Sequence, residues 1–468
     1  MARSATGERL GLGWRRVPRR CMIDAVIVMK FGGTSVGGAA AIRQVVGVVR
    51  SQVAASAVRR AVVVVSAHAG VTDALLDAAH AAAGGGGQDE VEAIVARHRD
   101  ILAGLDLEPD LLDPLLAELR DLARGLRLVG ETTAKVADAL LSYGERLSAR
   151  VVAAALAAAG TAAVAVDAFD AGLRTDAAHG RARPLADDGR IRRYLDKLKG
   201  VPVVTGFIAA DEQGNITTLG RNGSDYSAAL FGVAISAEEI QVWKDVDGVH
   251  TADPRLVPDA RPIERMSFAE VADLASFGSK VLHPAAMVPA MQAGIPIYVR
   301  NTLRPEAAGT RIDAEPDGAP PIVRAVAHRG GVAVVTVRSH RLLPQHDFLA
   351  RVFGQLAEAQ CDVGPVAVGE ASIAFAVEQV QVERAQQVLK RLGSVEATLD
   401  QALVGVLGMR ERLEGGLLAD VLRHLGDAEI LVRCAGLGPV GTTAAIVVAN
   451  ERAGEAVRLL HAKFLGGR

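Results

Sequence analysis

The sequence is poor in aromatic residues, in cysteine and in net charge. Aromatic side chains make up 3% of its 468 residues, and the net charge of −2 provides no basic field, so little in the chain suits nucleic acid. Its cysteines, Cys21, Cys361 and Cys434, lie too far apart for a disulfide framework or a zinc site. No uncharged apolar run reaches the ~18 to 20 residues of a membrane helix. These absences predict a cytoplasmic protein with no nucleic-acid or membrane partner.

Lysine is also scarce, which makes each lysine informative. Only 8 of the 52 Lys and Arg residues are lysine. Where the ordinary surface charge is arginine, a retained lysine favours a role for its compact ammonium group. Lys30, Lys244 and Lys280 all fall in motif-like stretches. We take these three as candidates for functional sites, with chance placement as the alternative.

Residues 26–36, VIVMKFGGTSV, combine an apolar run with a lysine, two glycines and two hydroxyls. The β-branched start predicts a strand buried on both faces, and a helical pattern follows the glycines. Gly32 and Gly33 let the backbone turn tightly and approach a ligand, so several N–H groups point at one place near Ser35. Lys30 adds a positive charge at the strand end. The pattern predicts a phosphate site; an ordinary turn with a surface lysine is the alternative.

Two further stretches place polar groups where strands end or helices begin. A second buried strand starting at Arg60 leads to Ser66, Thr72 and Asp73, at the ligand-facing edge of an open α/β sheet. Thr72 or Asp73 could instead cap the next helix. Glu145 follows a glycine at a predicted helix start, where it would either balance the helix dipole or bind a substrate amine.

The densest chemistry lies in residues 216–235, ITTLGRNGSDYSAALFGVAI. A strand at 216–219 leads through a glycine loop to an apolar helix. Arg221 can grip a carboxylate with two hydrogen bonds, and Ser224 can add a third. Asp225 can hold an amine or orient a metal-bound water. These three residue types on one loop at a helix start favour a functional site, with ordinary packing as the alternative.

The chain beyond residue 240 predicts a second set of polar groups and then a change of architecture. A short strand carries Lys244 and Asp245, and a helix over 267–286 carries Lys280, which could reach a nucleotide phosphate. Residues 306–319 are polar, with Gly and Pro, and predict a linker. Beyond it, two weak copies of a strand, helix, strand, strand, helix pattern predict two small α+β modules suited to sensing a ligand.

The domain organisation follows from these changes. Residues 1–21 carry six arginines without an apolar core, so they are not a secretory signal, and Met22 directly precedes the first strand. We predict an unstructured or spurious extension there, with a transit peptide as the alternative. The predicted domains are a catalytic domain over 22–318, a first module over 319–396 and a second over 397–468.

Several separated stretches together resemble the aspartate kinases of the amino-acid kinase family. They are KFGGTSV at 30–36, SAHAGVTD at 66–73, GERLSA at 144–149, TTLGRNGSDYSAA at 217–229, WKDVDGVHTADPR at 243–255 and FGSKVLHP at 277–284. The resemblance implies a three-layer αβα domain with a mostly parallel sheet, followed by two ferredoxin-like ACT modules. It also implies transfer of the γ-phosphoryl group of Mg-ATP to the β-carboxylate of L-aspartate, the first step of lysine, threonine and methionine biosynthesis.

The resemblance implies roles for individual residues. Lys30 and Asp225 would be catalytic. The aspartate site would comprise Thr72, Glu145, Phe207, Arg221 and Ser224. The ATP site would comprise Lys30, Gly32, Gly33, Ser35, Lys244, Asp245, His250, Arg255 and Lys280. No protein metal ligand is expected, because Mg²⁺ would be held mainly by the ATP phosphates.

Some positions depart from the family pattern. Asn222 stands where many members have glycine, which is tolerable if its backbone is left-handed. His250 replaces a common tyrosine, and Asp73 replaces a common asparagine. In the first ACT module, residues 362–364 read DVG where lysine-sensitive relatives have SVD. Because Gly364 lacks the carboxylate that would hold an effector's amine, we do not expect lysine feedback of the usual kind.

Two other functions compete with aspartate kinase. One is a catalytically inactive amino-acid sensor, and the other is a kinase for another amino acid such as glutamate. The retained charged residues oppose the first, and the GRNGSDYS loop with paired ACT modules opposes the second. The resemblance further implies a homodimer or higher homo-oligomer through the ACT modules, with an amino-acid effector bound there. No dehydrogenase follows residue 468, so we expect a kinase without a fused homoserine dehydrogenase.

Overall fold

The computed structural model describes residues 26–54, 60–279, 281–314, 323–339, 345–408, 416–437 and 443–466. The predicted extension over 1–21 lies outside these residues. The chain divides into two compact units. The first runs to Gly248 and includes His283–Glu315, and the second contains Val249–Leu282 and everything from Pro316 onward.

The first unit is built on a mostly parallel sheet with the strand order β3-β4-β2-β1-β7-β9-β10. Neighbours from β3 to β9 are parallel, and β10 runs antiparallel to β9. The parallel strands are rich in valine and isoleucine, as expected of strands covered on both faces. Their bounds are β1 Val26–Phe31, β2 Arg60–Val65, β3 Ala163–Val166, β4 Val201–Thr205, β7 Glu239–Lys244, β9 Ile297–Asn301 and β10 Thr310–Asp313.

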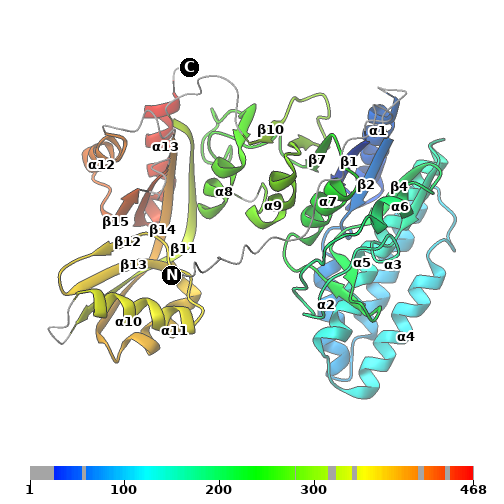
Figure 1. Cartoon of the computed structure of the whole chain (residues 1–468), viewed down its shortest axis with the longest axis horizontal. Coiled ribbons are helices and arrows are strands. Elements are labelled where there is room, and N and C mark those ends of the chain that lie inside the picture. The colour runs from blue at the N-terminus through cyan, green and yellow to red at the C-terminus, as the bar shows by residue number, and fades with distance from the viewer. Residues whose placement is uncertain are drawn as a thin grey trace, which may run out of the picture. The chain divides into compact units, whose positions relative to one another are not determined.

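Helices cover both faces of this sheet (Figure 1). The apolar core on one face joins β1, β2 and β4 to α1 Ala39–Ala54, α2 Val71–Ala83, α3 Gln88–Gly104, α4 Asp113–Val129 and α5 Ala134–Ala158. On the other face, α7 Gly223–Ala234 packs on β1, β2 and β7. The other helices of this unit are α6 Arg190–Leu195 and α9 Pro284–Ala293. The predicted three-layer αβα arrangement is therefore confirmed.

A small antiparallel hairpin separates β4 from α7. It pairs β5 Ile208–Ala210 with β6 Ile216–Thr218. The hairpin turn, from Asp211 to Asn215, is closed by the Asp211 carboxylate, which accepts hydrogen bonds from the N–H groups of Gln213 and Asn215. Its open end leads into the loop before α7.

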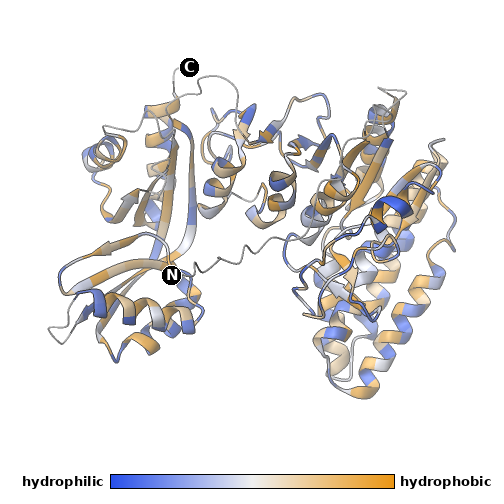
Figure 2. Cartoon of the chain, in the orientation of Figure 1, coloured by the Kyte–Doolittle hydropathy of each residue, from blue (hydrophilic) through white to orange (hydrophobic). Residues whose placement is uncertain are grey.

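The second unit contains a six-stranded sheet with antiparallel pairing in the order β12-β13-β11-β14-β16-β15. The second half of β14 is buried and apolar, whereas its first half carries Glu396 and Asp400; Figure 2 colours the strands of this sheet by hydropathy. Its strands are β11 Val323–Ser339, β12 Val366–Val368, β13 Ser372–Glu378, β14 Gly393–Gly408, β15 Val432–Leu437 and β16 Thr443–Ala449. Its other elements are β8 Arg265–Ser267, α8 Phe268–Ser276, α10 Gln345–Glu358, η1 Gln379–Gln381, α11 Val382–Leu389, α12 Leu417–Asp427 and α13 Asn450–Leu465.

Besides a smaller apolar cluster around Phe277 and Leu403, the described residues of this unit form two larger apolar cores, which alternate along the chain. One core joins the second half of β11 to α10, β13 and α11. The other joins the first half of β11 and the second half of β14 to α12, β16 and α13. β11 and β14 each contribute residues to both cores, and the boundary predicted between residues 396 and 397 stays a prediction.

Three element predictions are corrected by the structure. The linker predicted over 306–319 contains β10, whose residues pair with β9. The helix predicted over 267–286 is interrupted: α8 ends at Ser276 and α9 starts at Pro284, which begins a helix readily because its missing N–H has no helical acceptor there. The helix predicted to start near Glu145 begins at Ala134, after the capping residue Thr133.

Within the described ranges, no helix is long and apolar enough to cross a bilayer.

Candidate active site

Two lysines and one aspartate meet where parallel strands end. Lys30 lies near the end of β1 and Lys244 ends the neighbouring strand β7. Lys30 Nζ is 2.6 Å from Asp225 Oδ1, and Lys244 Nζ is 3.6 Å from Asp225 Oδ2. Asp225 lies in the first turn of α7, on the face of the sheet that α7 covers. Sequence reasoning placed all three residues in the site, and the structure brings them into direct contact.

Burial and charge act against each other in this cluster. Burial raises the pKa of Asp225, but the ammonium groups of Lys30 and Lys244 outweigh it and hold this pKa below its ordinary value. Burial lowers the pKa of Lys244, Asp225 opposes that shift, and the like charge of Lys30 adds to it. One carboxylate thus serves two lysines, and the surplus of basic groups favours an anion at this edge of the sheet.

The glycine loop after β1 packs against neighbouring strand ends. A Cβ at Gly33 would lie 3.1 Å from the carbonyl oxygen of Ala67, so this position suits a residue without a side chain. The N–H of Gly32 donates to the Trp243 carbonyl at 3.4 Å. The hydroxyl of Ser35 lies 2.8 Å from that of Thr302, which shows how Ser35 fastens the loop to the end of β9.

Glu145 lies in the middle of α5 and reaches the end of β2. A Cβ at Gly144 would be 2.7 Å from the Cβ of Ala67, so the glycine allows α5 to come this close. Glu145 Oε1 accepts a hydrogen bond from the N–H of Ala67 at 3.1 Å. Burial raises the pKa of Glu145 to about 8, although the Ala67 N–H and the charge of Lys30 oppose the shift. Glu145 Oε2 has no hydrogen-bond partner among the described residues.

The loop before α7 has the backbone that its sequence requires. Asn222 is the N-cap of α7 with φ 59°, so the expected left-handed conformation is confirmed. Ser224 is buried, and a Cβ at Gly206 would lie 2.6 Å from the Ser224 Cβ, so the end of β4 and the start of α7 are in contact. Phe207 also has a positive φ, of 62°, and its N–H donates to the Ser227 hydroxyl at 3.0 Å.

Thr72 and Asp73 lie in the first turn of α2. The N-cap of that helix is Gly70, with φ 77°, so neither residue is the cap that the sequence offered as an alternative. Thr72 is half-buried and Asp73 is exposed. Thr72 therefore remains a candidate for lining a pocket after β2.

The residues predicted to bind ATP are divided by the structure. Lys30 and Lys244 belong to the buried cluster, and Asp245 is exposed directly after β7. His250 and Arg255 belong to the second compact unit, where Arg255 Nη2 pairs with Asp253 Oδ2 at 2.6 Å. Lys280 lies outside the described residues.

A cavity that sequence reasoning missed lies at the start of α7. Its volume is about 270 Å³, and it is lined by Arg181, Arg183, Arg221, Tyr226 and His283, among others. Only Arg221 was predicted. The available signal was GRARP at 180–184, in which two arginines stand between a glycine and a proline.

A buried histidine pair beside the glycine loop was also missed. His68 Nδ1–H donates to the Val36 carbonyl, His98 Nδ1–H donates to the Ile94 carbonyl, and the ring centroids are 5.1 Å apart. Burial and the neighbouring His98 lower the pKa of His68 to about 3. Both rings are therefore neutral at ordinary pH. An apolar environment for His68 in SAHAGV was the only sequence signal.

No group of three or more His, Cys, Asp or Glu side chains that could hold a metal occurs in the part of the chain that the structure describes. The Asp225 carboxylate, which lies at the phosphate edge, is already engaged by two lysines.

The fold and the site define a kinase of small carboxylic or amino acids, and comparisons with known proteins agree. The amino acid kinase family profile matches residues 25–301. The chain is 32% identical to lysine-sensitive aspartokinase 3 of Escherichia coli, covering 94% of this chain and all of that protein. It is also 32% identical to the chloroplastic aspartokinase 1 of Arabidopsis thaliana, covering 93% and 80%. The chain belongs to the amino acid kinase family, among the aspartokinases.

Solved structures support the same conclusion. The E. coli aspartokinase III structure with aspartate and ADP, described as the R-state, superposes with a TM-score of 0.79 at 31% identity, covering 93% of this chain and 99% of that one. The T-state structure of the same enzyme with lysine and aspartate gives 0.78, also at 31% identity, covering 94% and 99%. An aspartate kinase of Clostridium acetobutylicum, at 21% identity and a TM-score of 0.77, covering 94% and 100%, shares the fold.

The buried His68 predicts a measurable loss of stability in acid. Its pKa is about 3 in the folded protein and about 6.5 when unfolded, so below pH 6.5 the unfolded chain takes up a proton that the folded chain refuses. The free energy of unfolding should therefore fall by about 1.4 kcal/mol per pH unit from this residue between those values. Denaturant titrations at pH 7, 6 and 5 should show a shallower pH dependence for His68→Gln. An unchanged slope would contradict a neutral buried His68.

Proposed function

We propose that the chain transfers the γ-phosphoryl group of ATP to the β-carboxylate of L-aspartate, forming 4-phospho-L-aspartate and opening lysine, threonine and methionine biosynthesis in the cytoplasm. The observation that carries this proposal is the contact of Lys30 and Lys244 with the buried Asp225, beside a glycine loop and the Glu145 Oε2 atom, which has no hydrogen-bond partner in the described part of the chain. It combines a phosphate edge with groups suited to an amino acid. The solved E. coli relative binds aspartate and ADP.

The reaction asks for positioning and charge neutralisation. An ionised carboxylate oxygen attacks the γ-phosphorus directly, the bond from that phosphorus to the β–γ bridging oxygen of ATP breaks, and ADP leaves with its electrons. No general base is needed, because the nucleophile carries no proton. Lys30 neutralises charge on the transferring phosphoryl group, and Asp225 keeps the ammonium groups of Lys30 and Lys244 in place.

The amino-acid end of the substrate is bound by groups on three segments. Glu145 Oε2 accepts from the substrate amine, and Arg221 pairs with the α-carboxylate, assisted by Ser224. Thr72 and Phe207 line the space between them. The lack of a partner for Glu145 Oε2 among the described residues supports this assignment, because a buried oxygen of this kind otherwise costs stability.

The nucleotide is bound along the edge that Lys30 and Lys244 define. Gly32, Gly33 and Ser35 form the loop that approaches its phosphates. The further assignments to this side are Asp245, His250, Arg255 and Lys280. Mg²⁺ arriving with the nucleotide would supply additional charge neutralisation there.

The C-terminal unit is assigned to regulation. We keep as proposals a catalytic domain over 22–318, ACT modules drawn from 319–396 and 397–468, assembly into a homodimer or larger oligomer, and an amino-acid effector. Lysine sensitivity, named for the E. coli relative, is not transferred to this chain. Gly364 offers no carboxylate, and a Cβ there would lie 3.2 Å from the Cβ of Ala376.

The proposed activity is tested by substrate preference. In an assay coupled to ADP release, L-aspartate should give the highest kcat/KM among L-aspartate, L-glutamate, N-acetylglutamate and carbamate. A clear preference for any other acceptor would overturn the proposal, and so would the absence of ADP release with all four.

Lys30→Ala should abolish most turnover. Removing the ammonium group beside the transferring phosphoryl group should lower kcat by about 10²- to 10³-fold, the loss typical of one preorganised electrostatic contact. Lys135→Ala, which changes an exposed lysine on α5, is the matched control and should retain full activity. Circular dichroism should find both variants folded. Activity that survives in folded Lys30→Ala would contradict the assignment.

Aspartate binding should release a proton from Glu145. With a pKa of about 8, this carboxyl group is mostly protonated at pH 7, and a bound ammonium group would favour its charged form. Calorimetric titration of aspartate in the presence of ADP should therefore depend on the ionisation enthalpy of the buffer, with release of up to about one proton. Glu145→Gln should lose this dependence. A wild-type heat that is the same in phosphate and Tris would argue against the role.

A further inference from the structure

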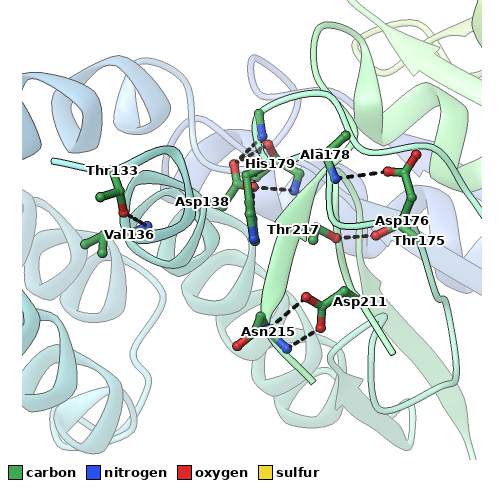
Figure 3. Close-up of polar contacts among 12 residues, drawn as sticks. Thr133, Val136, Asp138, Thr175, Asp176, Ala178, His179, Asp211, Asn215 and Thr217 are labelled. Atoms are coloured by element: carbon green, nitrogen blue, oxygen red, sulfur yellow. Dashed lines mark hydrogen bonds and ion pairs between the residues drawn. The ribbon is translucent and has the colours of Figure 1, made fainter. Parts of the chain in front are cut away.

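A second buried carboxylate on α5, Asp138, joins three separate segments of the first unit. It lies about two helical turns before Glu145 and is 1% exposed. Its oxygens accept hydrogen bonds from the N–H of Gly180 at 2.9 Å and from the hydroxyl of Thr218 at 2.6 Å. The Thr218 N–H, at 3.2 Å, and His179 Nδ1, at 3.0 Å, complete the set. Figure 3 shows Asp138 facing His179.

The segments that Asp138 holds carry the arginines of the cavity. His179 and Gly180 directly precede Arg181, and Thr218 ends β6 shortly before Arg221. Arg181 and Arg221 both line the cavity of about 270 Å³. The Asp138 carboxylate therefore contacts the backbone shortly before Arg181 and shortly before Arg221 in the sequence.

The two arginine segments are already fastened to each other without Asp138. The N–H of Ala182 donates to the Thr218 carbonyl at 2.8 Å, and the hydroxyls of Thr175 and Thr217 lie 2.6 Å apart. Asp138 adds a connection of a different kind, because it ties this pair of segments to α5. The same helix presents Glu145 at the end of β2.

This connection matters for recognising an amino acid. The α-amine and α-carboxylate of a substrate are separated by a fixed covalent distance, so the groups that bind them must also be held at a fixed separation. In the function proposed above, Glu145 on α5 takes the amine and Arg221 after β6 takes the carboxylate. The Asp138 hydrogen bonds to Thr218 are direct side-chain bonds between that helix and that strand.

We propose that Asp138 is a positioning residue for the amino-acid substrate, which sets the separation between Glu145 and Arg221 without touching the substrate itself. The inference rests on the proposed function. An aspartate side chain suits this task because its two oxygens lie within hydrogen-bond distance of all four donors, whereas an asparagine would turn an NH₂ group toward some of them. Asp138→Asn therefore weakens the connection while keeping the shape of the side chain.

The experiment compares Asp138→Asn with Asp211→Asn. Asp211 is 2% exposed, accepts from Asn215 and closes the turn at the other end of the same β5–β6 hairpin, as Figure 3 shows. Asp138→Asn should raise KM for aspartate by about 10-fold or more, the effect of losing hydrogen bonds to a charged group, with kcat and KM for ATP changed far less. Asp211→Asn should leave all three constants close to wild type.

A milder variant keeps the test decisive if Asp138→Asn does not fold. Thr218→Val removes one hydroxyl donor and should raise KM for aspartate by a few-fold, again without a matching change in KM for ATP. An unchanged KM for aspartate in the folded variants would overturn the proposal. A parallel loss of kcat with both KM values unchanged would also overturn it, because that pattern reports fewer folded molecules.

The test of the positioning role of Asp138 can be distinguished from the test of the proposed aspartate kinase activity. If the wild-type chain prefers another amino acid, the aspartate kinase assignment fails, and KM is then measured for the preferred substrate. A selective rise in that KM for Asp138→Asn would still support the positioning role, and its absence would overturn it.

Discussion

One buried carboxylate, Asp225, keeps the buried Lys30 and the half-buried Lys244 together at the carboxyl edge of the sheet. Neither lysine would be stable there alone, because an ammonium group removed from water needs an opposite charge. The contact requires β1 and β7 to be parallel neighbours, so that Lys30 and Lys244 end at the same edge. It also requires α7 to begin where it does, because Asp225 lies in its first turn. The sheet order and the helix start thus serve a single electrostatic arrangement.

Helix α5 has a comparable role on the amino-acid side of the site. Its glycine, Gly144, brings it against the end of β2, and Glu145 then lies in surroundings dry enough to raise its pKa to about 8. Asp138 on the same helix holds the hairpin end. Among the described residues one Glu145 oxygen has a hydrogen-bond partner and the other has none, so this buried carboxyl group can change its protonation state when a cation arrives. In the proposed function, substrate recognition and proton release would both depend on this helix.

The second unit is organised by sharing of strands. In each of the long strands β11 and β14, one half packs in one apolar core and the other half packs in a second core. The two cores are therefore distinct but are joined by shared strands. An effector that changed the packing of one core would act on strands that also belong to the other. This continuity gives the proposed regulatory unit a physical means of responding as a whole.

Strand ends, glycine turns and rare lysines were enough to predict buried strands, a phosphate site at Lys30 and two α+β modules, whereas the kinase domain and the roles of Asp225 and Lys244 in it were implied by the family resemblance. Those features are local: β-branched runs predict buried strands, and paired glycines predict close backbone approach. Family resemblance then supplied the reaction. The sequence alone misplaced the start of the helix that carries Glu145, because Gly144 was taken as a helix boundary. In the structure, the glycine at this position lets the helix come close to Ala67.

Only the tertiary structure could decide which distant groups meet. The protonation state of Glu145, the neutral pair of His68 and His98, and the bonds from Asp138 to Thr218 all depend on burial and on neighbours far away in the sequence. The amino-acid sequence gives the identity of a carboxyl group but not its exposure to solvent. The sequence by itself determined which chemical groups and which strands this protein has, and the packing of α5 and α7 against the sheet decided what charge and what partner each group keeps.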